Sequence, residues 1–445
     1  MAAAGSAVGL GNIWKFPYIA GQNGGSAFLI VYLICVVFFG LPLLMTEFII
    51  GKRARKSAFG AFRALGGNNR WQWLSWLSML TSFLIMGFYF VVTGWCFNYL
   101  VEAIGNVFNG MDATQLTEHF GSLVTNVPRM IMFSLIPVVL TAAVLWFDVN
   151  KGIEKLSKIL MPLLLIMMVL MAGRVLMLDG SNVGMRFFFQ ADFSKITPTV
   201  ILEAMAQCFF SLSIGMGALI TYGAYMPKNQ NVAITSIQVI VLDTLVALLA
   251  GVIIFPAVFA FGFNPAEGPQ LVFVVLPAIF EQMSFSWGSA VLFFSLLCIA
   301  ALTSTISLME VAVAFICEAS AELRGKNQQR RPLKRHQSVL LVSILLVVPI
   351  VLCALSLTGQ MQWLTFFGYN LFDCFDKLTS CLMMPLGAMG MAVFVGWFLS
   401  VKTSKGFLYS NNRLRRIGTN IYLVALRWIV PFAILAIFMN SLGVI

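Results

Sequence analysis

Long apolar runs separated by polar connections divide the chain into segments that can cross a bilayer. A transmembrane helix needs about 20 consecutive, mostly apolar residues. Runs of this kind lie near residues 1–21, 25–51, 72–104, 128–147, 155–178, 199–226, 231–262, 286–317, 338–357, 362–400 and 418–443. The pattern predicts an all-α polytopic membrane protein with these eleven spans.

Small residues interrupt two of these runs at corresponding places. The interruptions are Gly5-Ser6-Ala7-Val8-Gly9-Leu10-Gly11-Asn12 in the first run and Leu212-Ser213-Ile214-Gly215-Met216-Gly217-Ala218 in the sixth. Each glycine lowers helix propensity by roughly 1 kcal/mol relative to alanine, and irregular backbone within a membrane is tolerated only where it is buried or lines a cavity. We therefore predict two broken helices whose carbonyls and amides bind ions. Close helix packing is the alternative for either motif alone.

The order of the spans predicts an internal repeat, because spans one to five and six to ten each open with a broken helix. An odd number of spans in each half places the halves in opposite orientations, which is the architecture of secondary transporters. We expect one transporter domain over 1–445, with repeat one at 1–178, repeat two at 199–400 and an extra span at 418–443.

Composition and charge agree with a membrane protein. Charged residues make up 10% of the chain, against about 25% in soluble proteins. The net charge of +11 could suggest nucleic acid, but 21 of the 28 Lys and Arg lie in alternate connections, at 52–71, 148–158, 226–230, 318–337 and 401–417. Basic connections of polytopic proteins are cytoplasmic. We predict a lipid bilayer around the chain, a cytoplasmic N-terminus, an extracytoplasmic C-terminus and no nucleic-acid partner.

Several polar residues lie inside the apolar runs. Asp243 is flanked by Val, Leu and Ile, and an ionisable residue in that setting indicates a functional site. Glu47 lies near the cytoplasmic end of span two, where we expect it to be hydrogen-bonded. Span eight carries the run Ala300–Thr305, which is rich in hydroxyl groups. No nucleophile–base pair or metal-binding cluster occurs at the predicted midplane, so we expect no enzyme.

The first span begins only a few residues before its interruption. Seven helical residues rise about 10 Å, which is a third of a bilayer core. We therefore expect the first helix to lack a cytoplasmic half, as in a truncated form or a miscalled start.

The motifs Gly5–Tyr18, Asn23-Gly24-Gly25 and Ser211–Gly217 resemble those of the neurotransmitter:sodium symporter family, which has the LeuT-type fold. The resemblance extends over essentially the whole chain, and the eleven spans resemble the bacterial branch. Gly152 and Pro162 flank a part of span five that could unwind as a hinge, although a helix start and a kink are the equal alternative. Their spacing is similar to a Gly-x9-Pro motif of bacterial amino acid transporters in this family.

The resemblance implies two sodium sites, with sodium as a coupling ion and no further metal or cofactor. Site one would comprise the substrate carboxylate together with Ala7, Asn12, Ser211 and Asp243. Site two would comprise Gly5, Val8, Ala300, Thr303 and Ser304. These groups offer carbonyl, hydroxyl, amide and carboxylate oxygens, which suit a hard cation. Asp243 stands where many relatives have Asn.

For the substrate, the resemblance implies a carboxylate held by amides near Gly9 and Gly11 and by the hydroxyl of Tyr89, beneath a lid formed by Phe210. The implied binding residues are Ser6, Ala7, Gly9, Leu10, Gly11, Ile85, Tyr89, Phe210, Ser211, Ser213, Met216, Ser304 and Leu308. The implied gates are Lys15 with Asp376 outside, and Glu318 and Tyr225 inside. Lys15 replaces an Arg of many relatives, so its ion pair lacks a bidentate fork.

These features together predict a sodium-coupled symporter of neutral, hydrophobic or aromatic L-amino acids in a bacterial plasma membrane. A substrate-gated channel is one alternative, in which the polar residues would line a continuous pore. A truncated, inactive relative is the other.

Overall fold

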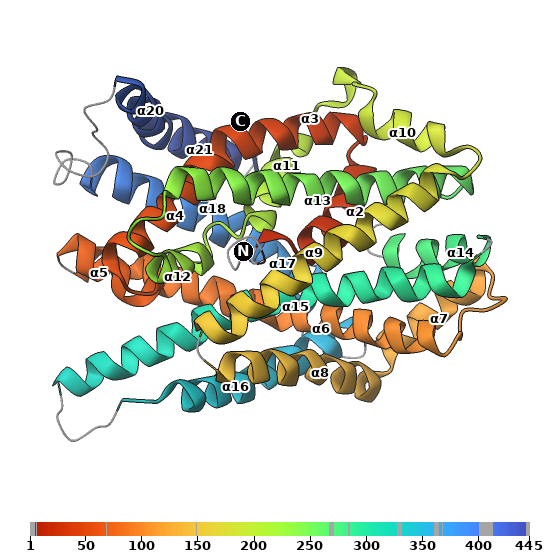
Figure 1. Ribbon diagram of the computed structural model, residues 1–445, viewed down its shortest axis with the longest axis horizontal. Helices are drawn as coiled ribbons and strands as arrows, with labels where there is room; N and C mark the ends of the chain where they lie inside the picture. Colours follow the sequence, from red (N-terminus) through yellow and green to blue (C-terminus); the bar gives the residue numbers. More distant parts are fainter. Residues whose placement is uncertain are drawn as a thin grey trace.

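The protein is a bundle of membrane-length helices with short helices at both ends (Figure 1). The structure, a computed structural model, describes residues 5, 7–67, 69–147, 149–266, 271–283, 285–326, 332–359, 365–366, 368–399 and 413–441. In these residues the only strands are β1 (Thr365–Phe366) and β2 (Tyr369–Asn370), which form a two-residue antiparallel ribbon. The architecture is therefore all-helical, as predicted.

Nine helices in the described part of the chain are long and apolar enough to cross a membrane. Six of them are α6 (Gln72–Ile104), α8 (Val127–Trp146), α9 (Val149–Leu176), α13 (Val232–Ala260), α15 (Ser286–Lys326) and α16 (Arg335–Leu357). The other three contain π-helical turns. They are α3–η2–α4 (Ser26–Cys35, Val36–Gly40, Leu41–Ala54), α17–η7–α18–η8 (Leu371–Lys377, Leu378–Met383, Met384–Val393, Phe394–Leu399) and α20–η9–α21 (Arg413–Val424, Ala425–Ile429, Val430–Ser441).

The remaining two spans are broken, where the glycine motifs predict it. Span one bends at Val8 and Gly9 and continues as η1 (Gly11–Lys15) and α2 (Phe16–Gln22). Span six consists of α11 (Pro198–Ser211) and α12 (Ala218–Tyr225), joined by an unwound segment. In that segment Gly215 has φ +90°, and a Cβ there would lie 2.5 Å from the carbonyl oxygen of Met384. Only glycine fits this close approach.

Short helices cap the two ends of the bundle. One end carries α7 (Ala113–Thr125), α10 (Ser181–Phe189), η4 (Phe193–Lys195), η5 (Leu271–Val275) and α14 (Leu276–Glu281). The opposite end carries α5 (Ala58–Gly66) and η3 (Asn69–Trp71), within the basic connection 52–71 (Figure 1). We call these the outer and inner ends.

The helix that contains the predicted span eight extends beyond that span at its C-terminal end. Hydropathy placed its end at residue 317, but α15 continues to Lys326. The extension carries Glu318 and Glu322, and Glu322 pairs with Arg63 of the inner helix α5. A prediction from hydropathy ends a span at the first charged residues. A helix can continue past them when it projects from the membrane.

Helices α4 and α12 pack with their backbones in contact. A Cβ on Gly51 would lie 1.9 Å from the carbonyl oxygen of Ile220, and a Cβ on Gly223 would lie 2.8 Å from that of Phe48. No side chain can stand between these helices at the two glycines. The inner half of span six is thereby fixed against span two.

Candidate functional site

A small cavity lies at the breaks of spans one and six, between α6 and α15. Its volume is about 20 Å³, which is room for about one water molecule. The lining residues are Ala7, Gly11, Ile85, Tyr89, Phe210, Ser211, Ser213, Met216, Ser304, Ser307 and Leu308. All of them except Ser307 belong to the substrate-binding set implied by the sequence. The structure therefore brings together residues from four spans that are far apart in the chain.

The other three residues of that set, Ser6, Gly9 and Leu10, do not line the cavity. The amide of Leu10 donates to the hydroxyl of Tyr89 (3.1 Å). A Cβ on Gly9 would lie 1.8 Å from Ser304 Oγ, so no side chain fits at this point. Ser6 lies outside the described residues.

Beside the cavity, Asn12, Ser211 and Asp243 form a buried polar cluster, here called the Asn12 cluster. Asn12 Nδ2 donates to Ser211 Oγ (3.0 Å), Asp243 Oδ1 (2.7 Å) and the Asp243 carbonyl oxygen (3.1 Å). Ser211 Oγ also donates to Asp243 Oδ1 (2.8 Å). Asn12 and Asp243 are fully buried. Several oxygens from spans six and seven thus point at one atom, the amide nitrogen of Asn12.

Two further side chains support the Asn12 cluster, and the sequence analysis missed both. The hydroxyl of Tyr32 donates to Asp243 Oδ2 (3.2 Å). Gln207 Nε2 donates to the carbonyl oxygen of Gly11 (2.7 Å) and so satisfies backbone that the break leaves open. Gln207 is a polar residue inside an apolar run, a signal that could have identified it. Tyr32 has no such signal, since tyrosine is common in membrane helices.

A second set of oxygens lies where α15 crosses the first break. The hydroxyl of Thr303 lies 2.8 Å from the carbonyl oxygen of Ala300 and 3.2 Å from that of Val8. Ser304 faces Gly9 on the same side of α15. Gly5 is buried on the same segment as Val8, three residues earlier. The residues implied as the second sodium site are therefore grouped around the break in span one.

Lys15 closes the site toward the outer end. Its Nζ donates to Asp376 Oδ1 (2.5 Å) and Ser380 Oγ (3.1 Å), and it lies 4.3 Å from the ring centroid of Phe210. Above it, Lys15 and Asp376 also line an outer cavity of about 430 Å³ together with Glu203, Lys377 and Cys381. The predicted Lys15–Asp376 contact is present, and it separates the outer cavity from the central one.

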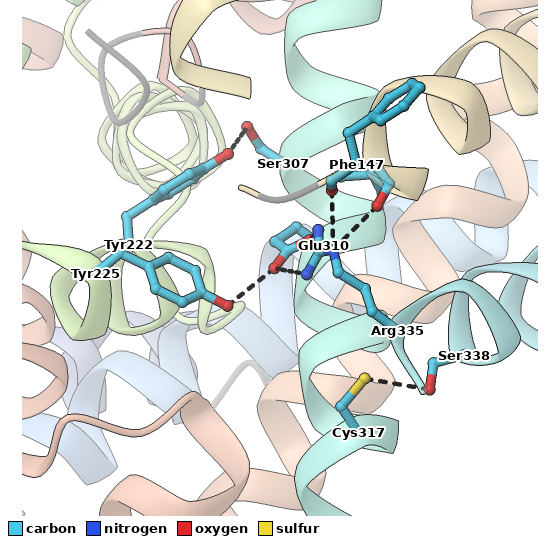
Figure 2. Close-up of polar contacts among 9 residues, drawn as sticks. Phe147, Tyr222, Tyr225, Ser307, Glu310, Cys317, Arg335 and Ser338 are labelled. Carbon is cyan, nitrogen blue, oxygen red and sulfur yellow. Dashed lines mark hydrogen bonds and ion pairs between the residues drawn. The ribbon is translucent and has the colours of Figure 1, made fainter. Parts of the chain in front are cut away.

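At the inner end, Glu310 is the centre of a polar cluster (Figure 2). The hydroxyl of Tyr225 donates to Glu310 Oε1 (3.0 Å), and Arg335 forms a bidentate pair with Oε1 (3.0 Å) and Oε2 (2.6 Å). Arg335 Nε also donates to the carbonyl oxygens of Leu145 and Phe147, at the end of α8. This Glu310 cluster ties α12, α15, α16 and α8 together.

Glu318, the acid implied as an inner gate, has different partners. Its Oε1 and Oε2 accept from the amides of Ser57 (2.6 Å) and Gly60 (3.0 Å). The side chain of Ser57 does not cap α5, so Glu318 satisfies the amides at that helix start instead. Tyr225, the other implied inner-gate residue, bonds Glu310 and not Glu318 in this conformation.

Comparison with known proteins identifies the family. A model of the sodium:neurotransmitter symporter family matches residues 1–119 and 114–444. The chain belongs to this family. It is 36% identical to the uncharacterized sodium-dependent transporter YhdH of Bacillus subtilis over 452 residues, covering 100% of this chain and 96% of that one. An uncharacterized sodium-dependent transporter of Haemophilus influenzae is 33% identical, with 99% and 96% covered.

A solved structure of a related protein shows that the similarity includes the fold. The crystal structure of MhsT in complex with L-phenylalanine is 36% identical, covers 99% of this chain and 97% of that one, and superposes with a TM-score of 0.88. The chain is thus a sodium-dependent, multi-span transporter with the LeuT-type fold, and it is not an enzyme.

The proposed hinge of this symporter is helical in the present conformation. Gly152 and Pro162 both lie within α9, which runs without a break from Val149 to Leu176. The structure describes the backbone of Gly152 but not the side-chain packing around it. Pro162 removes one backbone donor from the helix. Unwinding of this segment remains a prediction.

Proposed function

We propose that the protein couples the entry of sodium to the uptake of neutral, hydrophobic or aromatic L-amino acids across a bacterial plasma membrane. One observation carries the proposal. An apolar wall of Ile85, Phe210, Met216 and Leu308 stands beside the Asn12 cluster, and Gly9 leaves no room for an acidic side chain. A substrate that completes an ion site here has to bring its own carboxylate.

In the proposed first sodium site, the ion binds the carbonyl of Ala7, Asn12 Oδ1, Ser211 Oγ and Asp243, with the substrate carboxylate as the last ligand. Asn12 now presents Nδ2 to these oxygens, and its Oδ1 accepts from the amide of Gly9 (3.1 Å). The Asn12 amide therefore has to turn when sodium arrives. That turn releases the Gly9 amide for the substrate carboxylate, which links ion binding to substrate binding.

In the proposed second sodium site, the ion binds the carbonyls of Gly5, Val8 and Ala300 and the hydroxyls of Thr303 and Ser304. Support comes from the Thr303 hydroxyl, which already lies within hydrogen-bond distance of two of these carbonyls. The ion would replace that hydroxyl proton as the bridge between α15 and the break in span one. Sodium bound at this site would fix the broken helix of span one against the continuous helix α15.

The substrate side chain enters the apolar part of the cavity. Since about 20 Å³ admits no amino-acid side chain, Phe210 and Met216 have to move. Met216 is unbranched and can adapt its rotamer at low cost, which suits a pocket that takes both aliphatic and aromatic side chains. The complex of MhsT with L-phenylalanine supports an amino acid as the substrate class.

Alternating access follows from gates on the two sides of this cavity. On the outer side, Lys15 and Asp376 close over Phe210. On the inner side, Tyr225 holds α12 to Glu310, while Glu318 holds the connection before α5. Inward opening requires α12 to leave Glu310, with Gly152 and Pro162 as the hinge of span five. The basic inner end faces the cytoplasm in this proposal.

The test is uptake by the purified protein in proteoliposomes. An inward sodium gradient should drive accumulation of labelled leucine, tyrosine or tryptophan above the external concentration, and collapse of the gradient should abolish it. Equilibration without accumulation would indicate a channel. Absence of both sodium-dependent binding and flux would indicate an inactive relative.

A further inference from the structure

A buried carboxylate at the outer end has two basic partners. The side chain of Glu102, near the end of α6, is 5% exposed. Its Oε1 pairs with Arg129 at the start of α8, and Arg129 Nε is held by Asn98 Oδ1 (2.9 Å). On the other side, His119 Nε2 of helix α7 lies 3.0 Å from Glu102 Oε2. One carboxylate thus joins α6, α7 and α8.

The contact between His119 and Glu102 depends on a proton. Glu102 Oε2 and His119 Nε2 are both buried, and neither has an aligned hydrogen bond within the described part of the chain. A neutral imidazole therefore leaves the carboxylate oxygen with little compensation, which is costly in a buried place. A protonated imidazole at this distance is attracted by charge, whatever the alignment.

Helix α7 also presses on the outer side of the bundle. It begins with a capping box between Asp112 and Gln115, which satisfies backbone amides at the helix start. Phe120, one residue after His119, stacks on Phe273 of η5, with centroids 5.6 Å apart and planes 4° apart. Both α7 and α14 lie at the same end of the bundle in Figure 1. The position of α7 therefore fixes the lid formed by η5 and α14.

The same aromatic contacts reach the outer gate. Phe273 packs on Trp95 of α6 (5.7 Å), and Trp95 stacks on Phe372 of α17 (5.8 Å, 18°). Phe372 precedes Asp376, the gate carboxylate, by one helical turn. A movement of α7 thus changes the packing around the helix that carries half of the gate.

We propose that His119 is a proton-operated latch, which holds α7 and the η5–α14 lid on Glu102 when its imidazole is charged. In the closed outer end the imidazole of His119 lies 3.0 Å from the Glu102 carboxylate, so charge attraction holds α7 in place only while the ring carries a proton. Acidification stabilises the closed outer end, and the latch is lost as the pH rises and the imidazole becomes neutral.

Other titratable groups around α7 are accounted for. Arg129 pairs with Glu102 Oε1, and the ring of Tyr99 of α6 contacts the His119 ring. Glu281 of α14 accepts from the amide of Gly110, and Asp112 is engaged in the capping box. Glu118 of α7 is exposed. On α16, Cys353 is buried, and the charged residues of this helix lie at its opposite, N-terminal end. Among these types, imidazole alone ordinarily changes charge between about pH 5 and 8.

The test is amide hydrogen exchange of the intact protein in nanodiscs, at about pH 5.5 and pH 8, on peptides covering residues 271–281. The peptides from His119→Gln and from the parent protein have the same sequence. The effect of pH on the chemical exchange rate therefore cancels when the two exchange rates are divided. We expect His119→Gln to exchange about threefold or more faster than the parent at the lower pH and equally fast at the higher pH. His119→Lys should exchange slowly at both.

A matched control is available because the chain has two histidines. His336, on the inner side against Trp146, should be replaceable by Gln without altering the pH profile of the lid. A His119→Gln variant that exchanges faster by the same factor at both pH values would mean a merely structural contact and would overturn the latch. This readout needs no transport, so it can fail or succeed independently of the proposed substrate.

Discussion

The ammonium group of Lys15 lies 4.3 Å from the centre of the Phe210 ring and 2.5 Å from Asp376 Oδ1. The outer ion pair and the residue that covers the central cavity are therefore one unit. Phe210 cannot swing away from the cavity without changing the surroundings of the charge, and Asp376 cannot release Lys15 without loosening the cover.

Breaking this unit should impair coupling. Asp376→Asn leaves the 6%-exposed side chain of Lys15 without its counter-charge. We expect sodium-driven uptake to fall about tenfold, equivalent to roughly 1.4 kcal/mol, because the closed outer gate is destabilised. Initial uptake rates in proteoliposomes measure this. Lys377→Gln is the matched control, since Lys377 lines the same cavity but stacks on Tyr369. An unimpaired Asp376→Asn would show that Phe210 closes the site alone.

Asp243 should make transport independent of chloride. Its buried carboxylate supplies a fixed negative charge within the proposed first sodium site. Uptake should be unchanged when gluconate replaces chloride, whereas Asp243→Asn should raise the sodium concentration for half-maximal uptake by about tenfold or more. Tyr32→Phe, which removes a donor and no charge, should have a smaller effect. A wild-type protein that requires chloride contradicts this prediction.

Decarboxylated amines should not bind. Gly9 abuts Ser304, so the site offers no side-chain carboxylate to an amine there. We expect tryptophan, and not tryptamine, to protect the protein against thermal unfolding in the presence of sodium. Protection by tryptamine alone would require a different ion site from the one proposed.

The breadth of the pocket should depend on Met216. In the wild type, leucine and tryptophan should compete for the same site with affinities within about a hundredfold of each other. Met216→Phe should weaken tryptophan binding more than leucine binding, because a rigid ring takes the space that the flexible side chain yields. Competition binding with one labelled ligand measures both. Rejection of either class by the wild type by a thousandfold or more, equivalent to roughly 4 kcal/mol, would contradict this account.

Arg335 should stabilise the closed inner end. Arg335→Met leaves Glu310, whose side chain is 1% exposed, without a partner cation, and breaking a buried pair costs about 3–5 kcal/mol. We expect a lower melting temperature and a leak of accumulated substrate. Removing both charges, in Glu310→Met with Arg335→Met, should recover part of the stability.

The exposed pair between Arg63 and Glu322 is the control for that experiment. It lies at the same inner end, but its side chains are 37% and 32% exposed. Exposed pairs contribute at most about 1 kcal/mol, so Arg63→Met should barely change the melting temperature. Equal effects of the two arginine variants would mean that the Glu310 cluster has no special part in closing the inner end.

Local sequence signals predict much of this molecule. Hydropathy locates the eleven spans because each must satisfy its backbone within the membrane, and the glycines mark both breaks because Gly215 and Gly9 stand where a Cβ would collide with a neighbour. The residues of the Asn12 cluster came from the family resemblance, and the structure places them within hydrogen-bond distance of each other.

Two residues of the Glu310 cluster, Glu310 and Arg335, were missed by the sequence analysis, whereas Tyr225 was implied as an inner gate. Glu310 lies inside an apolar run and carries the same signal as Asp243, but Arg335 belongs to a basic connection and looks there like one more topological charge. Their pairing depends on how α15 and α16 cross, which hydropathy does not encode. The same holds for Glu318, whose partners are backbone amides that have no sequence identity of their own.

In the proposed orientation, the close contact of α4 with α12 places two cations of the moving inner half near the inner leaflet. At Gly51 and Gly223 the backbones of α4 and α12 are in direct contact, so we expect the two helices to move as one rigid unit. Lys52 and Arg55 lie at the inner end of this unit. Lys52 donates to the carbonyl oxygen of Gln230, and Arg55 donates to that of Met226. We expect a displacement of α12 to move these two cations within the headgroup layer, where a Lys or Arg interacts with anionic lipid by about 1 kcal/mol. We therefore expect the anionic lipid content of the inner leaflet to change the turnover rate of the transporter.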